Sequence, residues 1–290
     1  MDPSIEQPWT VRRLIGCAAL VLAGVLVCLD AWVDIYNIAR RDEEASQVWL
    51  VPVVVGWLIW TRRQHLRDVQ LGSHLMGPAL IAIGWAVSWF GYHNAIQSFW
   101  HGGAVMVAVG CLATVMGRDF VARFWPALAV LVFLVPVPAM ARQQVAIPLQ
   151  TATASVTQFV FELIGVEVYR SGNVLQYNGM DVAVAEACNG MRMVFVLILV
   201  CYAVAFASPL RAYVRVLILV LSPLCAIVCN VVRLVPTVWV YGRAPQPLAD
   251  SFHELSGWAM IFVAFLLVMG VLRLLQWTQL PVMQPQARTA

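Results

Sequence analysis

The chain has 290 residues, of which 61% are hydrophobic and 11% are charged, with a net charge of +3. Its mean hydropathy of +0.80 excludes a soluble globular protein, because a soluble fold of this length cannot bury so much apolar surface. We therefore expect an all-α polytopic protein surrounded by the lipid bilayer, with no nucleic-acid partner.

Eight apolar segments approach the roughly 20 residues that a helix needs to cross a bilayer. The first is interpreted as a retained helix and not a signal peptide, since no small-x-small cleavage site follows it. The polar residues 30–46 after it are assigned to an outer connection. The eight segments cover residues 12–30, 47–61, 76–92, 102–117, 121–137, 190–208, 212–232 and 254–275.

Charge alternates between the two ends of these segments. One side collects 11 arginines and 4 acids, a net +7, and the other collects 7 arginines and 11 acids, a net −4. Because cytoplasmic loops are enriched in basic residues, the first side is interpreted as cytoplasmic. The pattern predicts eight crossings, N-in and C-in, in a single membrane domain over residues 1–290 with its core at 45–275.

Two stretches between the fifth and sixth segments differ from these segments in amino-acid composition. Residues 143–166 are moderately apolar but rich in Thr, Ser and Gln, and we interpret them as an amphipathic helix at the outer interface, with a crossing as the open alternative. Residues 167–187 hold β-branched and aromatic residues around the turn signals Ser171-Gly172-Asn173 and Asn178-Gly179. This pattern predicts a small outer β-hairpin leading directly to Cys188.

Cys188 stands where this polar stretch meets the sixth apolar segment. Asn189 is a plausible N-cap for a helix beginning at the next residue, and the positive end of a helix favours a thiolate. Arg192 in the first turn adds positive charge, and Glu186 makes the other flank polar. The alternative is a small buried cysteine, which is how the remaining cysteines in apolar runs are interpreted.

Arg233 and His253 lie at the ends of the next two apolar segments. Asn230 and Arg233 share a helix face by i, i+3 spacing. An arginine there can also simply extend its side chain to the interface. Ser251 and Glu254 fit a capping box, which places His253 at the second position of the last helix.

The remaining histidines are expected to be solvated side chains. They are His65, His74, His93 and His101.

The predicted topology brings three of these groups to one side of the membrane. Cys188 begins the sixth segment outside, Arg233 ends the seventh outside and His253 begins the eighth outside, and consecutive segments with short connections are neighbours. A Cys–His pair can generate a nucleophile, and an arginine supplies positive charge for an oxyanion. A metal site would need more ligands than Cys188 and His253, so we expect no metal and no cofactor.

These residues resemble the exosortase/archaeosortase family of membrane cysteine transpeptidases. The resemblance is loose over residues 45–275 and close over 130–260. One departure is Asn189, where that family commonly has Ser. The matching segments are 133–138 (FLVPVP), 170–174 (RSGNV), 184–192 (VAEACNGMR), 230–233 (NVVR) and 253–258 (HELSGW).

The resemblance implies a function and a place in the cell. Cys188, Arg233 and His253 match the residues proposed as catalytic in that family. Its substrates are exported proteins with a C-terminal motif, one transmembrane helix and a basic tail, cut at the outer face of a bacterial inner membrane and passed to an amine acceptor that the sequence does not identify. The alternative is a membrane transporter or a non-catalytic export factor for protein or exopolysaccharide, although neither repeated halves nor mid-bilayer charges are evident.

Overall fold

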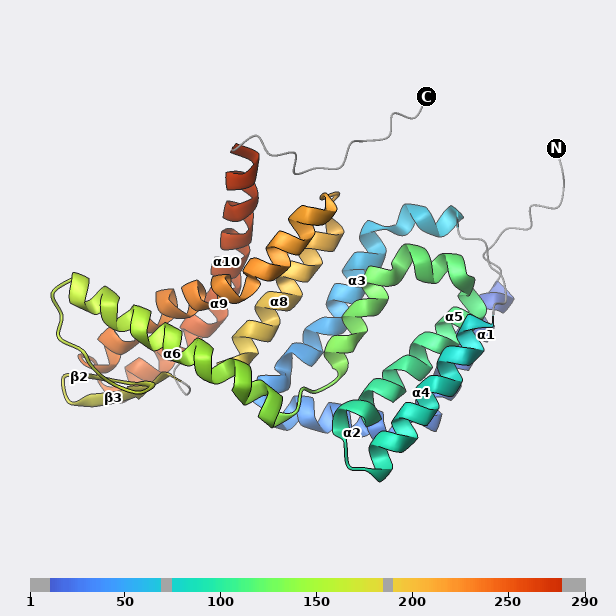
Figure 1. Cartoon of the computed structure of the whole chain (residues 1–290), viewed down its shortest axis with the longest axis horizontal. Helices are drawn as coiled ribbons and strands as arrows, with labels where there is room; N and C mark the ends of the chain where they lie inside the picture. Colours follow the sequence, from blue (N-terminus) through green and yellow to red (C-terminus); the bar gives the residue numbers. More distant parts are fainter. Residues whose placement is uncertain (1–10, 69–74, 185–189, 278–290) are drawn as a thin grey trace. The chain divides into compact units, whose positions relative to one another are not determined.

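The computed structural model describes residues 11–68, 75–184 and 190–277, and these are mostly helical (Figure 1). The chain divides into two compact units, Met1–Pro138 and Ala139–Ala290, which are described separately. Within the described residues, two helices are long and apolar enough to cross a membrane, Gln97–Leu134 and Ala212–Tyr241. A broken pair, Leu14–Val27 and Leu29–Arg41, bent by 78°, is a third candidate.

The first unit contains only helices among its described residues. Its elements are α1 (Val11–Val27), α2 (Leu29–Arg41), the 3-10 helix η1 (Glu43–Leu50), α3 (Val51–Thr61), η2 (Arg63–Asp68), α4 (Met76–His93), α5 (Gln97–Ala129) and η3 (Val130–Leu134).

No helix was predicted in residues 30–46, but α2 occupies most of this segment; its place on the outer side remains a prediction. Ala31, Ile35 and Ala39 recur every four residues and are all buried, so one face of this polar segment packs as an amphipathic helix. The segments predicted at 102–117 and 121–137 fall in α5 and η3, and a kink at Gly117 (φ 80°, ψ 176°) separates them within α5. Glycine adopts this backbone conformation without a steric penalty.

The prediction that His101 is solvated is wrong. Its side chain is fully buried in α5, and its Nε2 lies 3.0 Å from Oδ2 of Asp34 in α2. His65 and His93 are exposed as predicted, and His74 lies outside the described residues.

Glycines let α4 and α5 approach backbone to backbone in the first unit, where the two helices run side by side (Figure 1). A Cβ atom built on Gly84 would lie 2.9 Å from both the Gly103 carbonyl oxygen and the Val107 nitrogen, and one on Gly110 would lie 2.8 Å from the Ile81 nitrogen. Rigid backbone atoms occupy the space that any larger side chain would need.

Gly84→Ala is therefore expected to lower the free energy of unfolding by about 1–3 kcal/mol, the usual cost of overpacking. Gly56→Ala in α3 is the matched control, since a Cβ atom placed on Gly56 would meet nothing within 4 Å. Thermal unfolding of both variants in detergent measures the difference. Equal midpoints for the two variants would contradict the close contact between α4 and α5.

Among its described residues, the second unit joins four helices to a small sheet. Its elements are α6 (Ala139–Leu163), β1 (Tyr169–Ser171), β2 (Val174–Tyr177), β3 (Met180–Ala183), α8 (Gly190–Ala207), α9 (Ala212–Tyr241) and α10 (Gln246–Trp277). The helix predicted at 143–166 is present as α6 but starts four residues earlier. Its depth relative to a bilayer remains a prediction.

The predicted β-hairpin is a three-stranded antiparallel meander, ordered β1-β2-β3. Each of the two turn signals closes a two-residue loop, with Ser171 opposite Val174 and Tyr177 opposite Met180. Gly172 has positive φ in the first loop, and both Asn178 and Gly179 have positive φ in the second. These signs match type II′ and type I′ turns, which suit the twist of a hairpin.

One face of the sheet packs against helices within this unit. Leu175, Tyr177 and Val182 share a hydrophobic cluster with Phe161 of α6 and Leu234 of α9, and Figure 1 shows β2 and β3 beside α6. The sheet is therefore fixed against the half of α9 that also carries Arg233.

Candidate active site

Arg233 lies in α9 and is only 2% exposed. Its backbone carbonyl accepts a hydrogen bond of 2.7 Å from the hydroxyl of Thr237, one turn later. The simple alternative of an arginine reaching to the interface is therefore wrong. A charge buried in this way needs partners close by, because an unpaired buried charge carries a large desolvation cost.

The partners of the Arg233 guanidinium include two residues of α10. Its Nε donates to Oγ of Ser256 at 3.1 Å, and its Nη2 donates to the backbone carbonyl of His253 at 3.2 Å. The Ser256 hydroxyl donates in turn to the same His253 carbonyl at 2.7 Å. A Cβ atom on Gly257 would come within 3.5 Å of Nη2, so α10 presents small residues to the guanidinium.

The imidazole of His253 lies directly against Arg233. Nη2 of Arg233 is 3.4 Å from Nδ1 and 3.3 Å from Nε2 of the ring. Arginine can only donate hydrogen bonds, so a ring nitrogen that pairs with it must offer a lone pair. This geometry favours the neutral imidazole.

Burial and the neighbouring charges together lower the pKa of His253 and so favour the neutral imidazole. His253 lies just ahead of the span predicted at 254–275, and its pKa is lowered from the ordinary value of 6.5, first by burial and then by the positive charge of Arg233. Asp250 and Glu254 oppose this and raise the pKa. Asp250 is itself held by the Tyr241 hydroxyl, which donates to its Oδ1 at 2.7 Å.

The predicted capping box at the start of the last helix is wrong. The helix begins at Gln246, about two turns before His253, and the Ser251 hydroxyl donates to the Pro247 carbonyl from inside it. Proline is favoured in the first turn of a helix, which explains the earlier start. The pKa of His253 is therefore set by burial and by its charged neighbours, and not by a helix terminus.

Asn230 lies one turn before Arg233 on α9 and is 6% exposed. Its Oδ1 is buried without a hydrogen-bond partner among the residues that the structure describes. A buried carbonyl oxygen without a partner carries a desolvation cost. The atom is thus an available acceptor on α9, one turn before Arg233.

The structure brings Arg233 and His253 together, with Asn230 one turn before Arg233 on α9, whereas Cys188, Glu186 and Asn189 lie outside the described residues. Arg192 belongs to the first turn of α8, and its side chain is not among those that the structure describes.

Sequence reasoning missed Ser256 as a partner of the guanidinium. Ser256 follows His253 by three residues, so it lies on the same face of the helix, and this spacing could have predicted its place in the site. No group of three or more His, Cys, Asp or Glu able to hold a metal occurs within the described ranges.

The long apolar helices and the buried Arg233–His253 contact define a helical membrane protein with a polar site between two of its helices. A family model described as transmembrane exosortase matches residues 32–270. The chain therefore belongs to the transmembrane exosortase family, which places it in general terms among the membrane transpeptidases. Searches of curated proteins and of solved structures each found no match.

The lowered pKa of His253 leads to a prediction for the pH dependence of activity. If neutral His253 is the base, the rate will fall on the acid side of an apparent pKa below 6.5. Asp250→Asn removes a charge that stabilises the imidazolium, so it is expected to move this acid limb to still lower pH. The measurement is the rate of C-terminal processing from about pH 4.5 to 8, with Asp181→Asn as a control because Asp181 is an exposed acid in the sheet. An acid limb at higher pH in Asp250→Asn would contradict the assignment.

Proposed function

We propose that the protein is a cysteine transpeptidase that cuts C-terminal sorting signals at the outer face of a bacterial inner membrane. The single observation that carries the proposal is the contact between Arg233 and His253, two polar groups from different helices. Family membership supports the class of reaction, and the sequence supplies the nucleophile, Cys188. Eight crossings with both termini inside belong to the same proposal.

His253 begins the reaction as a base. A neutral imidazole takes the proton of the Cys188 thiol, and the thiolate attacks the carbonyl carbon of the scissile peptide bond. The new C–S bond leaves a negative charge on the former carbonyl oxygen. Arg233 either stabilises this oxyanion or orients the thiolate; both roles use its fixed positive charge.

The proton then moves to the leaving group. A protonated His253 lies against the positive charge of Arg233, which makes the imidazolium a stronger acid. It gives its proton to the leaving amine as the C–N bond breaks, and a thioester on Cys188 remains. His253 next removes a proton from the incoming amine, which attacks the thioester, forms a new amide and releases the cysteine; water in place of the amine gives hydrolysis.

The remaining polar residues have supporting roles in this scheme. Asn230 offers its oxygen, which has no hydrogen-bond partner within residues 11–68, 75–184 and 190–277, to a backbone N–H of the bound peptide or of the segment carrying Cys188. Asn189 and Arg192 favour the thiolate by their place at the start of a helix, and Glu186 keeps the approach to Cys188 polar. The substrate, anchored by one helix, docks laterally against α8, α9 and α10 with its scissile bond level with the site.

A processing assay tests the proposal. Proteins of the same organism that share a C-terminal motif, helix and basic tail are expressed with and without this chain, and the mass of the membrane-released product is measured. A product ending at one defined residue upstream of the helix is expected only when the chain is present. If every such reporter keeps its intact C-terminus, the proposed activity is wrong.

A further inference from the structure

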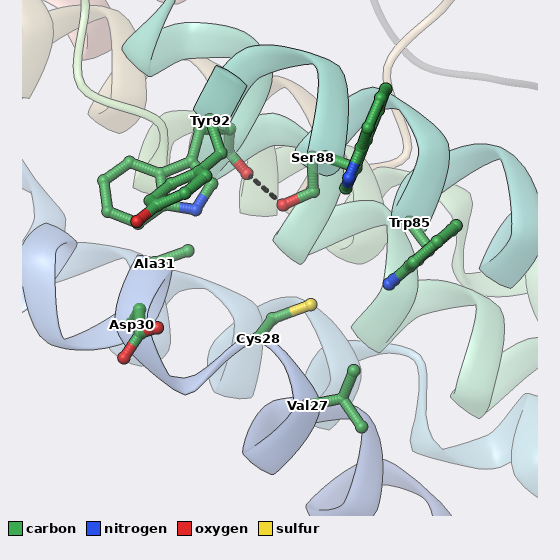
Figure 2. A pocket seen from close by; sticks show the side chains of 9 residues that line it. Val27, Cys28, Asp30, Ala31, Trp85, Ser88 and Tyr92 are labelled. Atoms are coloured by element: carbon green, nitrogen blue, oxygen red, sulfur yellow. Dashed lines mark hydrogen bonds between the residues drawn. The ribbon is translucent and has the colours of Figure 1, made fainter. Parts of the chain in front are cut away.

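A second feature of interest belongs to the first unit, whereas Arg233 and His253 belong to the second. A cavity of about 150 Å³ opens where the bend between α1 and α2 meets α4 and the beginning of α5. Figure 2 shows Trp85, Ser88 and Tyr92 on one side of it and Cys28 and Ala31 on the other. The Ser88 hydroxyl donates to the Trp100 carbonyl at 2.9 Å, which ties the wall formed by α4 to α5.

Aromatic rings make up much of the lining. Trp85, Trp89 and Tyr92 recur at spacings of four and three residues and so share one face of α4, and Trp100 faces them from α5. The rings of Tyr92 and Trp100 are 5.4 Å apart at an interplanar angle of 60°. An aromatic belt at a membrane surface accounts for exposed tryptophans one by one, but not for four rings gathered around a hollow.

One charged group completes the lining. Asp30, in the first turn of α2, is the acid among the described lining residues, which include neither Arg nor His. Its carboxylate is exposed and has no hydrogen bond or ion pair within the described part of the chain. A carboxylate and the faces of aromatic rings each attract positive charge, so a lining that holds both is complementary to a cation.

The cavity also lies beside the ends of two apolar segments. Trp100 is in the first turn of a helix that begins at Gln97 and is long and apolar enough to cross a membrane, and Cys28 lies near the end of the apolar segment predicted at residues 12–30. We expect the ends of apolar segments at the membrane surface, whichever side of the bilayer they face.

We propose that this cavity binds the ammonium group of a phospholipid headgroup. Its size suits a headgroup and is smaller than the several hundred Å³ typical of pockets for drug-sized ligands. The ammonium group lies among the rings of Trp85, Trp89, Tyr92 and Trp100, and the Asp30 carboxylate balances its charge. The site is independent of the proposed reaction.

Lipid retention measured by native mass spectrometry tests this site on the full chain. Purified protein is equilibrated with phosphatidylethanolamine and phosphatidylglycerol of identical acyl chains. The wild type is expected to retain the ethanolamine lipid about fivefold better. Asp30→Asn and Trp89→Leu are each expected to bring the ratio to about one, while the control Asp181→Asn leaves it unchanged. Gel filtration checks that all variants remain folded.

Free tetramethylammonium chloride, added in a separate titration, distinguishes the source of the ligand. If it displaces the ethanolamine lipid from wild type, the shared ammonium chemistry is supported. If it protects the wild type from thermal unfolding but no lipid preference exists, the site takes its ammonium group from solution and the lipid assignment is overturned. Equal retention of both lipids with no effect of tetramethylammonium, or a preference that survives in Asp30→Asn, overturns the site itself.

Discussion

Cys188→Ala is expected to abolish C-terminal processing, with a loss of roughly 10⁴-fold or more, the range seen when a covalent nucleophile is removed from a hydrolase. The physical reason is that the proposed reaction passes through a thioester, which alanine cannot form. The same processing assay gives the rate, and the amount of folded protein is checked by gel filtration. Cys188→Ser is expected to be almost as inactive, because a hydroxyl is a much weaker nucleophile than a thiolate.

Cys225→Ala is the matched control for this substitution. Cys225 is a free, half-buried thiol of α9 and is not part of the proposed site, so its variant is expected to process substrate at the wild-type rate. Normal processing by Cys188→Ala would contradict a cysteine enzyme. Loss of processing in both variants would indicate a general requirement for thiols and not a specific role of Cys188.

Arg233→Lys is expected to lower processing by about 10²–10³-fold, comparable to the loss of one donor from an oxyanion site. Lysine keeps the positive charge but lacks the planar set of donors that reaches Ser256 and the His253 carbonyl together. The variant is also expected to be less stable, because it makes fewer hydrogen bonds and so leaves buried partners of Arg233 unsatisfied. Rates and thermal midpoints are measured in parallel.

Ser256→Ala tests the hydrogen bond of the Arg233 guanidinium to Ser256 separately from its contacts with His253. It removes the hydrogen bond to Nε but leaves the contacts of Nη2 with His253 in place. The expected loss of rate is therefore small, about tenfold or less, in line with the loss of one neutral partner of a charged group.

For Arg233→Lys, a wild-type rate would show that positive charge alone suffices. That result would favour orientation of the thiolate over directed donation to an oxyanion.

Much of the helical framework could be predicted because the apolar segments are long and bounded by arginines. Residues 190–208 correspond to α8 (Gly190–Ala207), and 76–92 correspond to α4 (Met76–His93). The number of membrane crossings stays a prediction. Segments with mixed polarity were harder: α2 was missed because its apolar face holds only small or widely spaced residues, a weaker signal than a continuous apolar run.

The proximity of Arg233 and His253 could be predicted from connectivity, since the ends of consecutive helices meet. The detailed contacts could not, because they depend on where α10 begins. Ser251 and Glu254 suggested that the last helix starts at residue 251. The helix instead starts at Gln246, next to Pro247, and Ser251 lies inside it. The pairing of His101 with Asp34 was also hidden, since the two residues lie 67 positions apart and belong to different helices.

The burial of Arg233 has a consequence for how the chain is inserted into the membrane. Its described partners follow it in the sequence, His253 by 20 positions and Ser256 by 23. If α9 enters the lipid phase before α10 leaves the ribosome, the guanidinium enters without these two partners, at an insertion cost of about 3 kcal/mol. Retention of α9 beside the translocon until α10 emerges would remove that penalty, so biogenesis itself couples the last two helices.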